Sequence, residues 1–315
     1  MTSKEKLIGN IINNKYKIVK YIGSGSFGDV YQVINKKTNE LFALKVPIIT
    51  EEKNGQRMLL DEAKIYKHLS NPDKGVANVK VTKQQNKKMI VMDLLGPNIE
   101  ALFQKHKKFS LQSVIRLAIM MIDILQYIHS NGYIHRDLKP ENFVIGTSGT
   151  KGTNGTNSDN QFKSDTTKLF LIDFGLAKKF IKKDGSHIDF CDKKKFCGTA
   201  KFASIAAHAN SEQSRKDDLE AIAYILIYLY RGKLPWQGIK TKDKKKRYLH
   251  IYKEKMKHTP EELCKGMPRE FIVFLNYIKT LSFDEKPPYS SFKKMFNRLY
   301  DSMEYDDDKF EWEES

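Results

Sequence analysis

The chain has 315 residues, of which 40% are hydrophobic and 30% charged, and it carries a formal net charge of +17. This length and composition suffice for a buried core in one or two domains and exclude wholesale disorder. No apolar run in the sequence approaches the length of a membrane span, and no hydrophobic signal core follows Met1. The three cysteines lack C-x-x-C spacing, so we expect reduced thiols, no zinc site and a cytoplasmic or nuclear location.

Residues 16–95 predict a small unit of antiparallel strands with one helix, preceded by an extension over residues 1–15. Runs rich in Val, Ile, Tyr and Phe occur there, and turn residues separate them. The expected strands cover residues 16–22, 29–34, 40–46, 76–82 and 89–93, and the expected helix covers residues 56–69.

Three glycines lie between the first two expected strands with the spacing Gly23-x-Gly25-x-x-Gly28. The same spacing opens dinucleotide-binding folds, where it joins a strand to a helix. Here a second strand-like run, Val30-Tyr31-Gln32-Val33, follows the glycines. The context therefore favours a hairpin whose backbone amides approach the phosphates of ATP. An ordinary glycine hairpin would be the preferred interpretation if no other motif accompanied it.

Residues 96–315 predict a larger, mostly helical unit. Apolar residues recur there at helical spacing, and one of the helices is apolar on nearly every face, as expected at the centre of a unit. A Gly-, Thr- and Asn-rich segment at 146–167 predicts a low-complexity insertion at the surface. The expected helices and their end signals are 111–128 (N-cap Ser110, stop Asn131-Gly132), 218–231 (stop Gly232), 268–281 and 289–301.

The stretch His135-Arg136-Asp137-Leu138-Lys139-Pro140-Glu141-Asn142 contains the parts that a phosphoryl-transfer site needs. Asp137 can accept a proton from an attacking hydroxyl, and Asn142 can hold a magnesium ion. Lys139 can meet the moving phosphoryl group. These three residues are the candidate catalytic residues.

Two further motifs fit the same chemistry. Lys45, in Ala43-Leu44-Lys45-Val46, matches a strand lysine that neutralises the α- and β-phosphates. Its expected partner on the following helix is Glu62, and the neighbouring Asp61 is the alternative. Asp173, in Asp173-Phe174-Gly175, matches an aspartate that chelates magnesium. Each motif is weak alone, but their common order along the chain makes the joint signal strong.

Several stretches together resemble the casein kinase I family of protein serine/threonine kinases, and the likeness covers nearly the whole chain. Residues 93–97 (Asp-Leu-Leu-Gly-Pro) resemble the hinge of that family, and residues 198–205 stand where most protein kinases have an A-P-E motif. The resemblance implies an α+β, two-lobed protein kinase fold, with a small antiparallel N-lobe and a larger, mostly helical C-lobe. It also implies a monomer that uses ATP and Mg²⁺ to phosphorylate serine or threonine, and Lys139 is typical of such enzymes.

The resemblance assigns ATP binding to the glycine turn, the strand lysine and its partner acid, the hinge, and the Asp-Phe-Gly aspartate. Magnesium is assigned to Asn142 and Asp173. The residues assigned to ATP are Ile22, Gly23, Ser24, Gly25, Ser26, Phe27, Gly28, Val30, Ala43, Lys45, Glu62, Met92, Asp93, Leu95 and Asp173.

The positive charge is explained if the substrates are acidic or already phosphorylated, as the resemblance implies. Lys201, where the family usually has arginine, is a candidate for docking such substrates, as are Lys246 and Arg247 in the Lys-Asp-Lys-Lys-Lys-Arg run of residues 242–247. That run has two other interpretations, a solvated loop and a nuclear localisation signal. The lysines at 193–195 are open to the same docking interpretation. The acidic end, residues 305–314, is typical of a solubilising terminus, and a second hypothesis is that it visits the basic dock and competes with substrate.

Two rival functions come from other classes. A pseudokinase scaffold would bind partners without catalysis, but the candidate base and metal positions are all intact. A basic nucleic-acid-binding module would explain the charge, but the sequence contains no recognition-helix, zinc or RNA-binding motif. We therefore expect protein substrates and no specific nucleic acid.

Overall fold

A computed structural model of the chain describes residues 5–25, 28–48, 54–85, 87–147, 164–239, 241 and 243–313. The chain forms two compact units, each built from two segments. The first comprises Met1–Asn98 and Phe143–Gly175, and the second comprises Ile99–Asn142 and Leu176–Ser315. The sequence placed one boundary after residue 95, close to the first of these, but assigned residues 143–175 to the larger unit.

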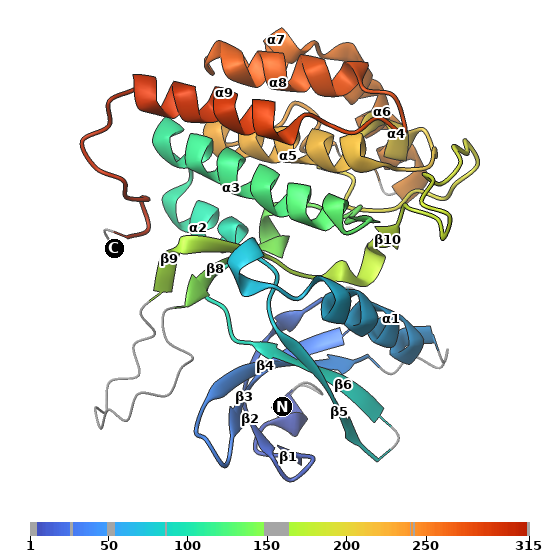
Figure 1. Cartoon of the computed structure of the whole chain (residues 1–315), viewed down its shortest axis with the longest axis vertical. Coiled ribbons are helices and arrows are strands. Elements are labelled where there is room, and N and C mark those ends of the chain that lie inside the picture. The colour runs from blue at the N-terminus through green and yellow to red at the C-terminus, as the bar shows by residue number, and fades with distance from the viewer. Residues whose placement is uncertain are drawn as a thin grey trace. The chain divides into compact units, whose positions relative to one another are not determined.

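The first unit contains a six-stranded antiparallel sheet with the order β1-β2-β3-β4-β6-β5. Side chains alternate between its two faces, so neighbouring residues of β4 reach different clusters. Leu44 packs with Tyr31 and Val33 on one face. Ala43 packs on the other face against α1 (Asn54–Leu69), which lies along the sheet in Figure 1. The strands are β1 (Ile11–Ile12), β2 (Tyr16–Ser24), β3 (Gly28–Asn35), β4 (Leu41–Pro47), β5 (Val79–Gln84) and β6 (Lys87–Asp93).

A separate hairpin of β8 (Phe143–Thr147) and β9 (Ser164–Leu171) belongs to the first unit. Backbone hydrogen bonds explain this, because Gly96 N donates to Ile145 O at 2.8 Å and Leu171 N donates to Gly75 O at 2.8 Å. The low-complexity segment expected over 146–167 is thus partly strand at both ends. Its centre, residues 148–163, lies outside the described residues.

The second unit is mostly helical, as the sequence predicts. Figure 1 shows α3, α5, α8 and α9 packed side by side, with α5 between α3 and α8. Residues 217–229 of α5 are buried, which confirms it as the central helix. The helices are α2 (Ile99–His106), α3 (Leu111–Ser130), α4 (Ile205–His208), α5 (Arg215–Arg231), α6 (Lys244–Lys257), α7 (Pro260–Leu263), α8 (Arg269–Thr280) and α9 (Tyr289–Ser302), and β7 (Tyr133–Ile134) pairs with β10 (Lys178–Lys179).

The predicted helix signals hold at α3 and α5. Ser110 Oγ accepts a hydrogen bond from Ser113 N and caps α3, and Gly232, at φ +83°, ends α5 in the left-handed conformation. Four short 3-10 turns complete the described secondary structure: Glu5–Leu7, Pro72–Lys74, Pro140–Asn142 and Phe174–Leu176.

Within the described residues, α3 is the one helix long and apolar enough to cross a membrane by length and composition. The sequence was expected to contain no apolar run of that length, and this expectation is wrong for α3. More than half of its most apolar window is buried inside the structure, among the neighbouring helices, as in the core helix of a folded unit.

The C-terminal segment packs against the start of α3. Glu311 accepts hydrogen bonds from Ser110 N and from Ser113 Oγ, and the guanidinium of Arg116 lies 3.7 Å from the ring centroid of Phe310. A solubilising terminus and a visit to the basic dock were the two interpretations of the acidic end. Its described part is instead held at the first turns of α3, because it satisfies hydrogen-bond donors at that helix end.

Candidate functional site

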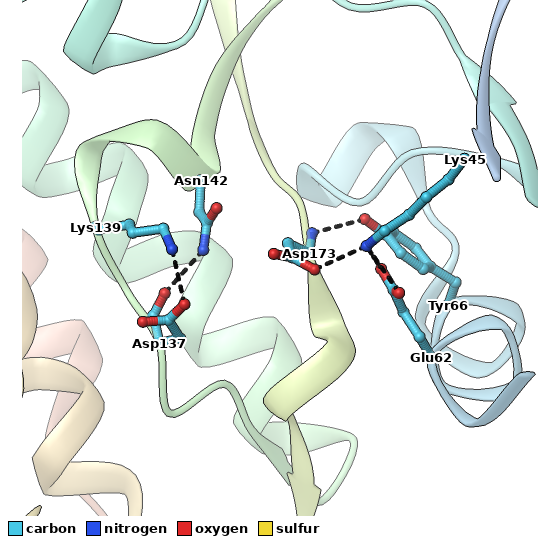
Figure 2. Close-up of polar contacts among 7 residues, drawn as sticks. All are labelled: Lys45, Glu62, Tyr66, Asp137, Lys139, Asn142 and Asp173. Carbon is cyan, nitrogen blue, oxygen red and sulfur yellow. Dashed lines mark hydrogen bonds and ion pairs between the residues drawn. The ribbon is translucent and has the colours of Figure 1, made fainter. Parts of the chain in front are cut away.

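In the first unit, Lys45 of β4 lies between two carboxylates. Its Nζ donates to Glu62 Oε1 at 2.8 Å and Oε2 at 2.9 Å, and to Asp173 Oδ1 at 2.9 Å (Figure 2). Lys45 and Glu62 are 3% and 1% exposed. The predicted pairing with Glu62 is therefore present, whereas the alternative, Asp61, is exposed and binds Lys64 at 2.7 Å.

Burial and mutual charge perturb both partners of this pair. Burial opposes the charge of Lys45, but the attraction of Glu62 and Asp173 outweighs it and holds the pKa of Lys45 above its usual value. Burial raises the pKa of Glu62 to about 7 against the opposing attraction of Lys45, and the like charge of Asp173 adds to the rise. The ammonium thus remains charged near neutral pH, while Glu62 titrates there.

Helix α1 orients Asp173 as well as Lys45. Tyr66 follows Glu62 by one turn, and its hydroxyl accepts a hydrogen bond from Asp173 N at 2.9 Å (Figure 2). The Tyr66 ring meets the ring of Phe174 edge to face, with centroids 4.8 Å apart. Asp173 adopts a left-handed φ of +66°. Because this conformation is rarely populated by a non-glycine residue, the contacts with α1 are needed to hold it.

The predicted glycine turn joins β2 to β3, which confirms the strand-turn-strand interpretation and excludes the dinucleotide-binding one. Gly25 N donates to Gly28 O at 2.8 Å. A Cβ on Gly28 would lie 2.6 Å from Val46 O, and one on Gly25 would lie 3.6 Å from Lys45 Nζ. Glycine is thus required at 28 by close backbone approach. Ser26 and Phe27 lie outside the described residues.

The residues predicted to surround adenine lie on and after adjacent strands. Ala43 of β4 is paired with Met92 of β6, and both belong to the apolar cluster that Val30 completes. Asp93 ends β6, where its Oδ2 accepts a hydrogen bond from Asn78 N at 2.9 Å. The remaining predicted residues, Ile22, Gly23, Ser24 and Leu95, lie at the end of β2 and just after β6.

In the second unit, the three candidate catalytic residues lie together. Asp137 is 6% exposed, and its Oδ2 accepts a hydrogen bond from Lys139 Nζ at 2.9 Å. Asn142 Nδ2 donates to Asp137 O at 2.9 Å, which fixes the amide orientation and leaves its oxygen as the group that can bind a cation (Figure 2). Thr199 Oγ1 donates to Asp137 Oδ1 at 2.7 Å. The sequence analysis gave Thr199 no role, because 62 residues separate it from Asp137.

Asp218 of α5 holds the backbone before Asp137. Its carboxylate accepts hydrogen bonds from His135 N at 2.7 Å, Arg136 N at 2.9 Å and His129 Nε2 at 2.9 Å. Burial opposes its charge, but these contacts, led by that with His129, hold the pKa of Asp218 below its usual value. Arg136 takes a left-handed φ of +66°. The sequence predicted residue 218 only as the start of a helix and assigned it no role in the site.

The candidate docking residues lie in two different settings. Lys201 is half-buried, with its Nζ 3.3 Å from the ring centroid of Tyr228, and burial lowers its pKa. Lys246 and Arg247 are exposed on the first turn of α6, which Asp243 caps through the backbone amides of Lys245 and Lys246. From Lys244 onward this run is exposed, as the solvated-loop interpretation expected, but it is helix and not loop. Lys242 lies outside the described residues.

A second basic cluster borders a cavity of about 380 Å³ in the second unit. Glu212 lines it, and Glu212 Oε2 forms ion pairs with Lys178 Nζ at 2.8 Å and with Lys194 Nζ at 3.0 Å. One carboxylate thus faces several cations, so the cavity attracts anions. The residues around it are Arg136, Lys178, Lys194, Lys195, Cys197, Ser211, Glu212 and Gln213.

Asp173 of the first unit and Asn142 of the second unit each carry an oxygen of the kind that Mg²⁺ prefers, a carboxylate and an amide carbonyl respectively. The described residues contain no group of three His, Cys, Asp or Glu side chains that could hold a metal by themselves. A family model described as protein kinase domain matches residues 16–299 of the chain.

Proposed function

Because the chain belongs to the protein kinase family, we propose that it is a serine/threonine kinase similar to casein kinase I, acting on acidic or previously phosphorylated proteins. Membership of the family makes it a phosphotransferase that uses ATP and protein substrates. The proposal adds the acceptor residue, the substrate charge and the roles of individual side chains.

The observation that carries the proposal is the buried Asp137 carboxylate bound by Lys139 and Thr199. Asp137 accepts the proton of the substrate hydroxyl as the hydroxyl oxygen attacks the γ-phosphorus of ATP, and ADP leaves. Lys139 neutralises charge that develops on the phosphoryl group. Most of the rate enhancement then comes from positioning and electrostatic stabilisation, because little covalent chemistry falls to the protein.

Lys45 holds the α- and β-phosphates in this proposal, and Glu62 orients it. The amides of the glycine turn approach the phosphates, and the turn itself is held by the close approach of Gly28 to Val46 O, which a Cβ would prevent. Asp173 and Asn142 hold Mg²⁺, which neutralises phosphate charge when bound.

The positively charged side chains favour acidic substrates. Lys246 and Arg247 are exposed on α6 and available to bind an acidic peptide. Lys201 binds the face of Tyr228, so it would have to leave the ring to reach a substrate. The cavity beside Arg136 and Lys194 offers an alternative place for a phosphate. Whether the residues of α6 or this cavity binds the acidic groups, the preference for acidic peptides should weaken as salt concentration rises.

Kinase assays on three peptides test the proposal. Two peptides share a serine target and differ by one phosphoserine three residues before it, and the third has tyrosine at the target position. We expect a large preference for the phosphorylated serine peptide and negligible transfer to tyrosine. Equal rates on the two serine peptides would refute the acidic preference, while efficient tyrosine phosphorylation would refute the acceptor assignment.

Two variants test the residue roles. Asp137→Asn should abolish transfer to peptide, and substantial retained activity would overturn the assignment of the base. The double variant Lys246→Ala/Arg247→Ala should lower kcat/KM about tenfold for the phosphorylated peptide alone. Lys253→Ala removes an exposed charge from the same helix and serves as the matched control.

A further inference from the structure

Lys255 of α6 is a buried lysine whose contacts are unusual. It is 1% exposed, and its Nζ donates to Ala200 O at 3.1 Å and to Ala203 O. The rings of Tyr224 and Trp236 flank the ammonium, with centroids at 4.7 and 4.9 Å. Within the described residues, no carboxylate lies within ion-pair distance of it. Backbone carbonyls and aromatic faces therefore solvate this cation.

A buried ammonium without a paired carboxylate costs free energy that an apolar side chain of similar length would avoid. Burial lowers the pKa of Lys255 to about 7, against the attraction of Glu220. The advantage of lysine over methionine at this place must come from the donors that it supplies. Those donors reach only backbone oxygens of residues 200–203.

The segment of residues 199–204, here termed the acceptor segment, is fastened at several points by other elements. Trp236 Nε1 donates to Lys201 O at 2.7 Å, and His208 Nε2 lies 3.0 Å from Ala200 O. Ser204 Oγ donates to Asp217 Oδ1 at 2.6 Å. Lys255 adds two hydrogen bonds to these, one to Ala200 O and one to Ala203 O. Among these side chains, Lys255 alone binds two carbonyl groups of the acceptor segment.

The other end of the acceptor segment meets residues 135–142, here termed the catalytic loop. Thr199 Oγ1 donates to Asp137 Oδ1 at 2.7 Å. The preceding Gly198, at φ +105°, lies so close to the loop that a Cβ would be 2.5 Å from Arg136 O. Only one peptide unit separates Thr199 from Ala200, so a shift of the carbonyls held by Lys255 displaces the hydroxyl that orients Asp137.

We propose that Lys255 is a positioning residue for phosphoryl transfer, which acts by holding the acceptor segment and, through Thr199, the carboxylate of Asp137. The inference rests on the proposed role of Asp137 as the base. It concerns the acceptor side of the reaction, because the contacts of Lys255 lie within the second unit, while Lys45 and the glycine turn belong to the first. Loss of Lys255 therefore lowers kcat for peptide and leaves KM for ATP unchanged.

Lys255→Met is the main test, because methionine keeps the length of the side chain and removes its donors. We expect kcat for peptide to fall at least tenfold, with KM for ATP within twofold of wild type. Lys253→Met, on the exposed face of the same helix, is the matched control and should retain wild-type kinetics. Lys255→Gln keeps one donor without charge, so its kcat should lie between those of Lys255→Met and wild type.

A double-mutant cycle separates positioning from a general structural role. If Lys255 acts through Thr199, then Thr199→Ala should reduce kcat much less in the Lys255→Met background than in wild type. Multiplicative effects of the two substitutions would overturn the inference, as would an unchanged kcat in Lys255→Met. Should Lys255→Met fail to fold, the same cycle is run with Lys255→Gln.

The outcomes also distinguish this inference from the proposed function. An inactive Asp137→Asn together with a fully active Lys255→Met would retain Asp137 as the base and reject the positioning role. An active Asp137→Asn would reject the assignment of the base itself, whatever the kinetics of the Lys255 variants.

Discussion

The ionisation of Glu62 should control the pH dependence of ATP use. Its pKa is about 7, and only the ionised carboxylate can hold Lys45 at 2.8 Å. Since this pKa is raised above that of an ordinary carboxyl group, the ion pair is lost as pH falls through 7. A group with a pKa of 7 is about 90% ionised at pH 8 and about 10% at pH 6, so kcat/KM for ATP should fall about tenfold over this range.

Glu62→Gln isolates this effect from other titrations. ATP itself gains protons in the same range, and Asp217, whose pKa burial raises to about 7, titrates there too. Both occur equally in the variant. We expect Glu62→Gln to have a kcat/KM near the low-pH value of wild type and to lack the tenfold fall. The assay is initial rate at limiting ATP from pH 6 to 8, and parallel profiles for the two proteins would refute the reasoning.

Three further substitutions test the second unit. Gly198→Ala should lower kcat about 100-fold, because its Cβ would lie 2.5 Å from Arg136 O, and steady-state kinetics with near-normal kcat would contradict this. Asp218→Asn should lower kcat, and it should lower the free energy of unfolding, measured by urea denaturation, by about 3 kcal/mol. The reason is that an amide cannot replace a carboxylate that accepts three hydrogen bonds. Glu311→Ala should lower the free energy of unfolding by about 1 kcal/mol while kcat is kept, since it removes an acceptor at the start of α3. A fall in kcat in that variant would show that the C-terminal segment influences catalysis.

The strands and the main helices could be predicted because local patterns determine them, whereas most ATP-binding residues were assigned through the family resemblance and stay a prediction. The choice between Glu62 and Asp61 was also within reach. Leu59, Ala63 and Tyr66 are buried on one face of α1, and Glu62 shares that face by helical spacing, whereas Asp61 points to solvent. The spacing of the apolar residues along the helix therefore identifies Glu62, and not Asp61, as the acid on the buried face.

The contacts that hold the catalytic loop could not be predicted in this way. Thr199 meets Asp137 across 62 residues, and Asp218 meets His135 across 83. Such pairs depend on tertiary packing and leave no periodic trace in one sequence. Helix α6 was not among the predicted helices for a different reason, because its run of cations hides a helix whose local signal is the N-cap Asp243.

The buried charges of the second unit match the groups that they hold. Asp218, an acceptor, binds two backbone N–H groups of the catalytic loop, and Lys255, a donor, binds two backbone C=O groups of the acceptor segment. Each lies on a helix and fastens a segment that lacks regular structure. Burying a charge costs desolvation free energy in the folded state. Removing the charge recovers this cost and so offsets part of the stability that is lost with its hydrogen bonds. Lys255→Met should therefore lower the free energy of unfolding less than Asp218→Asn does, while it still disturbs the geometry around Asp137.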